Sequence, residues 1–190
     1  MNRVSLQTTE SLWRRLQKVL RHLWLDGSDT RKLVPDDLAE KLREQVAASE
    51  SGHTGQIRIC VESGLPAGYL WQYLWRRVPM QELGRQRALD LFSRLRVWDT
   101  EANNGVLIYL MLAERDIELV ADRALMRMAP ASFWQAAAGQ LSAELCDGAF
   151  EAGLCGVVAT VDGELRRHFA VARGTAVDHP NELPDEPVLL

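Results

Sequence analysis

The chain lacks most of the short motifs that reveal an enzyme or a metal protein from sequence. It has no Gly-rich phosphate loop and no GxGxxG segment, which argues against P-loop and Rossmann nucleotide sites. Its three cysteines, Cys60, Cys146 and Cys155, form no CxxC pair, and none is followed by arginine six positions later. Its four histidines show no metal-ligand spacing. A zinc site and a cysteine-dependent phosphatase loop are therefore excluded, and we expect inert thiols in a reducing compartment.

Long hydrophobic runs and an excess of basic charge are also missing. The longest uncharged stretch, residues 128–143, is too short to span a bilayer, and residues 1–7 lack the apolar core of a signal peptide. The chain carries 22 Lys and Arg against 26 Asp and Glu, for a net charge of −4. We therefore expect a soluble cytoplasmic protein without a transmembrane segment and without a nucleic-acid partner.

Hydrophobic periodicity predicts a mixed fold. Helical spacing is found at residues 12–24, 35–46, 81–98, 133–145 and 150–169. Strands are predicted at 57–61, 106–112 and 117–121, the last two joined as a hairpin. This order predicts an α/β fold, a three-layer αβα sandwich with an additional N-terminal helix.

Two segments of this pattern leave alternatives open. Residues 57–62 alternate apolar and polar side chains, which predicts a half-buried strand. Residues 63–79 concentrate aromatic side chains and favour an irregular flap or short hairpin, in which a fourth strand could lie between Leu65 and Val78. The aromatics from Tyr69 to Trp75 form a partner-binding patch if exposed and core if buried, and we favour the core.

The two ends differ in charge from the middle of the chain. Residues 1–33 form an amphipathic helix and linker, with seven basic and three acidic residues between Arg3 and Lys32. That helix could touch a membrane surface or an acidic partner, but we expect its apolar stripe to pack on the domain. Residues 34–170 are predicted to form the compact domain, and residues 171–190 a flexible, acidic, Pro-rich tail.

One loop could carry chemistry. Asp99, Glu101 and Asn103 occupy alternate positions between a helix and the central strand, so a looped backbone could direct their oxygens at a hard cation. The spacing does not fit an EF-hand, whose twelfth-position glutamate would fall at Leu110. The alternative is a simple helix-to-strand turn, because Asn104-Gly105 is a strong turn dipeptide.

A second polar pair follows the next strand. Asp122 and Arg123 lie at the end of the second hairpin strand, and antiparallel pairing would bring Asp122 beside Asn104-Gly105. We therefore predict a shared site with Asp99, Glu101, Asn103, Asn104 and Asp122 as metal ligands. Asp122 and Arg123 are the candidate catalytic residues.

The segment from Arg85 to Arg123 resembles the TPM-domain family. The similarity extends from about Val34 to Phe169, and its most specific parts are the Asn104-Gly105 turn and the strand end at Asp122-Arg123. The chain looks like the short cytoplasmic bacterial form, of the kind encoded beside LemA. The resemblance implies an αβα sandwich around a small mixed sheet, a phosphatase label and binding of a divalent metal, Ca²⁺ or Mg²⁺. Many members have glycine where this chain has Ala124, which would matter if that position needed a left-handed backbone.

Two hypotheses follow. The first is a divalent-cation-binding interaction module that acts with a membrane-associated protein partner. The second is a weak metal-assisted phosphomonoesterase, in which the metal polarises the phosphoryl group and activates water. We favour the interaction module, because the sequence contains no complete catalytic constellation. Neither hypothesis specifies an oligomeric state.

Overall fold

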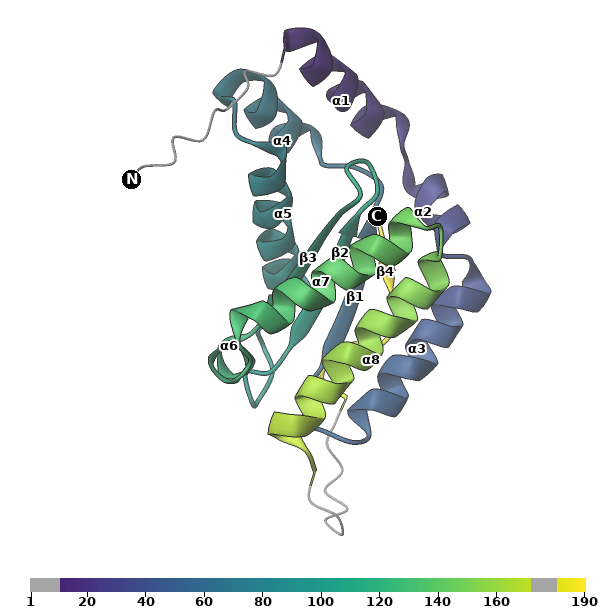
Figure 1. Ribbon diagram of the computed structural model, residues 1–190, viewed down its shortest axis with the longest axis vertical. Helices are drawn as coiled ribbons and strands as arrows, with labels where there is room; N and C mark the ends of the chain where they lie inside the picture. The colour runs from purple at the N-terminus through teal and green to yellow at the C-terminus, as the bar shows by residue number, and fades with distance from the viewer. Residues whose placement is uncertain (1–10, 172–180) are drawn as a thin grey trace.

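The computed structural model describes residues 11–171 and 181–190. They form a four-stranded sheet with helices on both faces, so the predicted three-layer α/β sandwich is confirmed (Figure 1). The helices are α1 (Leu12–Trp24), α2 (Gly27–Leu33), α3 (Asp36–Glu50), α4 (Ala67–Trp71), the π-helix η1 (Gln72–Arg76), α5 (Met80–Arg94), α6 (Arg123–Met128), α7 (Ala131–Cys146) and α8 (Phe150–Phe169). The strands are β1 (Ile57–Glu62), β2 (Val106–Met111), β3 (Asp116–Ala121) and β4 (Val188–Leu189).

The sheet is mixed, with the order β3-β2-β1-β4. Strands β1 and β2 run parallel, with Ile57 opposite Val106, and the crossover between them contains α4, η1 and α5. Strands β2 and β3 form the predicted hairpin, with Val106 opposite Ala121. Helices α3, α7 and α8 pack on one face of the sheet, while α4 and α5 pack on the other. The first residue of β2 and the last residue of β3 therefore lie at the same end of the sheet.

Strand β1 is buried on both faces, so the prediction of a half-buried strand is wrong. Its apolar residues join the core beneath α3, α7 and α8, while Arg58, Cys60 and Glu62 face the other side. There Arg87 of α5 binds the Glu62 carboxylate with two nitrogens, Nη2 lying 2.7 Å from Oε1. Tyr109 donates its hydroxyl to Glu62 Oε2 at 2.8 Å. Because these partners satisfy the charge, a polar residue can occupy a buried strand.

The C-terminal segment is part of the sheet. Residues 171–190 were predicted to be a flexible tail, and this is wrong for residues 181–190, since β4 pairs in parallel with β1 and Leu183 is buried. Arg58 donates to the backbone carbonyls of Pro184 and Glu186, the latter at 2.8 Å. Arg58 thus holds the C-terminal segment in place, and the carbonyls of that segment allow β1 to bury a charged side chain. Residues 172–180 lie outside the described residues.

The aromatic segment after β1 is helical, so the predicted flap or hairpin, with its fourth strand, is wrong. Residues 67–76 form α4 and η1, and the αL conformation of Arg77 ends them. Leu70 and Tyr73 are buried, whereas Trp71 and Trp75 are 53% and 71% exposed. The segment therefore contributes both to the core and to the surface.

Helix α1 packs in the opposite sense to the prediction. Its inward residues are Arg15, Val19 and His22, while its leucine and tryptophan side chains are exposed. Polar contacts to the domain fix this orientation: Arg15 donates to the carbonyl of Tyr73, and His22 Nδ1 accepts the N–H of Leu65 at 3.0 Å. None of the helices in the two described ranges is long and apolar enough to cross a membrane.

Gly105 is required by a close backbone approach. A Cβ atom at this position would lie 2.0 Å from the carbonyl oxygen of Val97. The left-handed residue of the turn is Asn103, with φ of 51°, and Gly105 is not among the residues with positive φ. The glycine before β2 therefore lets the loop from Val97 fold back onto the strand.

We predict that Gly105→Ala lowers the free energy of unfolding by roughly 1–3 kcal/mol, because backbone must move to admit the methyl group. Gly139→Ala is the matched control: Gly139 lies within α7 with no neighbour within 4 Å of an added Cβ, so alanine should preserve or raise stability there. Urea denaturation of both variants measures the effect. Equal stability of Gly105→Ala and the wild type would contradict the packing argument.

A buried polar cluster joins α3, the following loop and α8. Ser49 Oγ donates to Asp162 Oδ1 at 2.7 Å and lies 2.9 Å from His53 Nε2. His53 Nε2 is also 3.2 Å from Asp162 Oδ1, so serine and carboxylate meet the same ring nitrogen. A hydrolytic triad needs them on opposite nitrogens, and Ser49 is buried. The cluster therefore ties two helices together rather than forming a nucleophile.

This cluster predicts a pH dependence of stability. Burial lowers the pKa of His53 below its ordinary value of 6.5, so the unfolded chain binds the proton more readily. The stability contributed by neutral His53 is full above pH 6.5 and is lost as the pH falls through its folded pKa. Between pH 7.5 and pH 5, the urea midpoint should fall more for the wild type than for His53→Gln, because glutamine does not titrate. Equal losses in the two proteins would refute the assignment.

Candidate functional site

The predicted site residues lie at the edge where β2 begins and β3 ends, near α6 in Figure 1. The hairpin brings two segments together there, as predicted. The N–H of Asp122 donates to the carbonyl of Gly105 at 2.9 Å, and the N–H of Ala124 donates to the carbonyl of Asn103 at 3.1 Å. Arg123 Nη2 lies 3.2 Å from Asn103 Oδ1. Asn103, Asn104, Asp122 and Arg123 therefore form one group, which we call the hairpin-edge group.

Asp99 and Glu101 do not join this group. Both are exposed, and Asp99 forms an ion pair of 3.0 Å with Arg96. Successive turns from Arg96 to Asn103 direct these side chains outward, so alternate positions in the sequence do not converge. Within residues 11–171 and 181–190, no three His, Cys, Asp or Glu side chains are placed to hold a metal ion. The predicted five-residue ligand set is thus not assembled.

Two oxygens of the hairpin-edge group are buried without a donor. Asn104 is fully buried and Asp122 is 5% exposed. No described residue donates a hydrogen bond to Asn104 Oδ1 or Asp122 Oδ2. A buried acceptor left unpaired costs roughly 1–3 kcal/mol. Carboxylate and amide oxygens are the ligands that Ca²⁺ and Mg²⁺ take in proteins.

The remaining polar atoms of these residues hold the two oxygens in place. Asp122 Oδ1 accepts the N–H of Arg123 at 2.6 Å and caps α6. Asn104 Nδ2 donates to Thr54 Oγ1 at 3.0 Å, and its backbone N–H donates to Thr100 Oγ1 at 3.2 Å. Each side chain is therefore held by one polar atom, while its remaining oxygen has no hydrogen-bond donor among the described residues.

Ala124 does not disturb this arrangement. It is the second residue of α6 and is not among the described residues with positive φ. Its N–H makes the contact to Asn103 that closes the turn. A glycine at this position is thus not needed for a left-handed backbone in this chain.

The structure adds carboxylates that the sequence did not indicate. Burial, together with the nearby Asp185 and Glu182, raises the pKa of Glu50 to about 8. Glu50 Oε1 accepts the N–H of Ile57 at 2.9 Å, and Glu182 Oε2 accepts the N–H of Glu101 at the same distance. These acidic residues meet because the C-terminal segment folds back on β1. The sequence signal was weak, since Glu182 and Asp185 lie in a Pro-rich acidic stretch typical of a tail.

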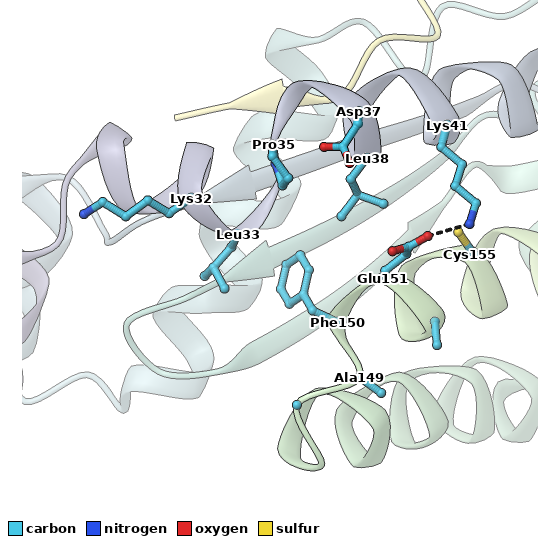
Figure 2. Close-up of a pocket in the computed structure, with 12 residues that line it drawn as sticks. Lys32, Leu33, Pro35, Asp37, Leu38, Lys41, Ala149, Phe150, Glu151 and Cys155 are labelled. Atoms are coloured by element: carbon cyan, nitrogen blue, oxygen red, sulfur yellow. Dashed lines mark hydrogen bonds and ion pairs between the residues drawn. The ribbon is translucent and has the colours of Figure 1, made fainter.

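A separate cleft of about 600 Å³ lies between the α2–α3 region and the start of α8 (Figure 2). Phe150 and Leu38 line it, and Lys41 pairs with Glu151 across it. Burial raises the pKa of the Cys155 thiol, which makes it a poor nucleophile at neutral pH. None of the predicted site residues lines this cleft. The cleft therefore adds no support to either hypothesis on function.

Comparison with known proteins identifies the family. The sequence model of the TPM domain matches residues 28–164, which is most of the chain. Among solved structures, the chain is similar to the BA42 protein from the psychrophilic bacterium Bizionia argentinensis, determined by NMR. The TM-score is 0.65 at 20% identity, over 80% of this chain and 92% of that one, which supports the fold. No curated protein matches the sequence. The match to the domain model, together with the hairpin and its polar edge, shows that the chain belongs to the TPM-domain family.

Proposed function

We propose that this protein is a divalent-cation-binding interaction module whose ion site is centred on Asn104 and Asp122. The observation that carries the proposal is the pair of buried oxygens, Asn104 Oδ1 and Asp122 Oδ2, without a donor among the described residues. A cation would supply the positive charge that these acceptors lack. Ca²⁺ takes six to eight oxygens, so water and backbone carbonyls would complete its shell.

The site contains one carboxylate, which limits its affinity. Calcium affinity rises with the number of charged ligands, and sparsely charged sites bind at roughly 10⁻⁴–10⁻³ M. Asp99 and Glu101 are not ligands in this proposal, because they face outward. Ca²⁺ is favoured over Mg²⁺, since Mg²⁺ demands near-ideal octahedral geometry and gives up water reluctantly.

The partner part of the proposal rests on a different surface. Trp71 and Trp75 are exposed on α4 and η1, and the guanidinium of Arg76 lies 5.6 Å from the Trp71 ring centroid. Exposed tryptophan and arginine are enriched at protein interfaces. A membrane-associated protein partner is the class we propose for this surface. The cytoplasmic location expected from the sequence stays a prediction.

The cation site is tested by calorimetry and thermal unfolding with Ca²⁺ and with Mg²⁺. Ca²⁺ at about ten times its Kd should raise the Tm by roughly 3–6 °C. Asp122→Asn should abolish the effect while keeping the α6 cap, because asparagine caps helices well. Asn104→Asp should lower the Tm without metal by carboxylate repulsion and tighten Ca²⁺ binding by about tenfold.

Asp99→Asn is the matched control, because it removes one carboxylate from the same loop but outside the hairpin-edge group. Its Ca²⁺ response should equal that of the wild type. Absence of heat and of any Tm change in the wild type would reject cation binding. Loss of Ca²⁺ binding in Asp99→Asn but not in Asp122→Asn would show that the ion site lies outside the hairpin-edge group.

The second candidate function is a metal-assisted phosphomonoesterase. The observation that favours it is Arg123, a guanidinium with 78% side-chain exposure held beside Asp122 by Asn103. Arginine binds phosphate oxygens through paired N–H donors. A bound divalent ion would polarise the phosphoryl group and lower the pKa of a bound water. Arg123 would orient the phosphate, and the Asp122 carboxylate would hold the ion.

This activity predicts turnover of p-nitrophenyl phosphate that depends on added Ca²⁺ or Mg²⁺. Arg123→Gln should reduce kcat/KM by about 10- to 100-fold, and Asp122→Asn should abolish turnover. Arg127→Gln, an exposed arginine in the last turn of α6, is the control and should have no effect. If Asp122→Asn retained full turnover, or if the wild type showed none, the phosphatase hypothesis would fail, whereas the cation titration would be unaffected.

A further inference from the structure

Helix α1 presents an apolar face to solvent, which we call the α1 face. Its exposures range from 38% at Leu16 to 87% at Trp24. The α1 face consists of Leu12, Trp13, Leu16, Leu20, Leu23 and Trp24. At about 100° per residue these six side chains fall within about 120° of the helix circumference. A continuous apolar stripe of this kind on a folded protein marks a surface that another body covers.

The residues that the structure describes do not cover the α1 face, because polar contacts hold the helix to the domain by another side. The guanidinium of Arg15 lies 4.6 Å from the Tyr73 ring centroid and donates to the Tyr73 carbonyl. Arg21 pairs with Glu114, and His22 accepts from the backbone of Leu65. Rotating the leucines inward would break these contacts. The outward orientation is therefore a property of the folded chain.

The charge of α1 indicates what covers the face. The helix carries four basic residues, Arg14, Arg15, Lys18 and Arg21, and no acidic residue, in a chain whose net charge is −4. Arg15 is buried against Tyr73, and Lys18 and Arg21 share the single carboxylate of Glu114, so the helix keeps a net positive charge. Arg14, Lys18 and Arg21 lie on the side of the helix away from the α1 face, which is where interfacial helices carry their basic residues. An anionic lipid surface attracts such residues, and tryptophan is favoured at the headgroup level.

The length of the helix determines how it would sit. Thirteen residues extend about 20 Å, whereas a span needs about 20 residues, so α1 is too short to cross a bilayer. A short helix with leucine and tryptophan on one side and basic residues on the other lies in the plane of the interface. Helix α4 lies at the same end of the molecule in Figure 1. It continues into η1, and this segment also exposes tryptophan and arginine: Trp71, Trp75, Arg76 and Arg77.

From these observations we propose that α1 docks flat on an anionic lipid bilayer, with the α1 face buried at the boundary between headgroups and acyl chains. The inference is independent of the cation site, which lies at the opposite end of the sheet. It assigns direct lipid binding to this chain, in addition to any protein partner at the membrane.

The test is co-sedimentation of the full chain with phosphatidylcholine vesicles, with and without phosphatidylglycerol, in the presence of EDTA. Binding to the anionic vesicles should be at least about tenfold tighter and should weaken with salt. Tryptophan emission should shift to the blue on binding. Leu16→Gln combined with Leu23→Gln should lose binding, and Arg14→Glu should weaken it on anionic vesicles alone.

The matched control is Leu89→Gln combined with Met126→Gln, which removes two exposed apolar side chains outside α1 and should bind like the wild type. Thermal unfolding of each variant shows that the fold is kept, as expected for exposed positions. The variant that combines Trp71→Ala with Trp75→Ala measures how much these two tryptophans contribute to vesicle binding. Equal binding by wild type and the Leu16, Leu23 variant overturns the proposal.

Three other results would also overturn it. The first is equal binding to neutral and anionic vesicles. The second is failure of the folded wild type to bind either vesicle. The third is a concentration-dependent dimer in sedimentation that the Leu16, Leu23 variant abolishes, without vesicle binding, since a second copy would then be the occupant.

Discussion

Strand β1 must bury an arginine and a glutamate at the centre of the sheet, and much of the fold serves that requirement. Arg87 of α5 reaches Glu62 with two nitrogens, and Tyr109 of the neighbouring strand completes the carboxylate's partners. Among the described residues, Arg58 donates through Nη1 to two carbonyls of the C-terminal segment, while its buried Nε has no partner. A buried charge without such partners costs several kcal/mol, so the position of α5 and the return of the C-terminus are coupled to β1.

The same arrangement places the candidate site. Once β2 pairs with β1 and β3, the loop before β2 must end at a fixed point, and Gly105 lets it pass against Val97. Asn104 and Asp122 are then buried at the hairpin edge, each held by one polar atom, while the other oxygen has no hydrogen-bond donor among the described residues. A cation at this edge would stabilise the fold by an amount that depends on its concentration relative to its Kd. Binding and stability are therefore expected to be linked.

The two surfaces proposed to act lie at opposite ends of the sheet (Figure 1). The hairpin edge lies beside α6, whereas α1 and α4 lie at the far end. A protein that rests on a bilayer through α1 would therefore hold its hairpin edge away from the lipid. That geometry leaves the exposed guanidinium of Arg123 accessible to phosphate compounds in solution.

The sequence by itself determined the order of the main elements, the β2–β3 hairpin and the meeting of Asp122 with Asn104-Gly105. These follow from local periodicity and from antiparallel pairing of neighbouring strands. Only the tertiary structure decided that Asp99 and Glu101 face outward, that residues 181–190 join the sheet and that α1 turns its leucines to solvent. Each of these depends on a partner distant in the chain: Glu182 for the Glu101 backbone, Arg58 for the C-terminal carbonyls, and Tyr73 for Arg15. A periodic pattern shows which side of a helix is apolar, but distant contacts determine which side faces the domain.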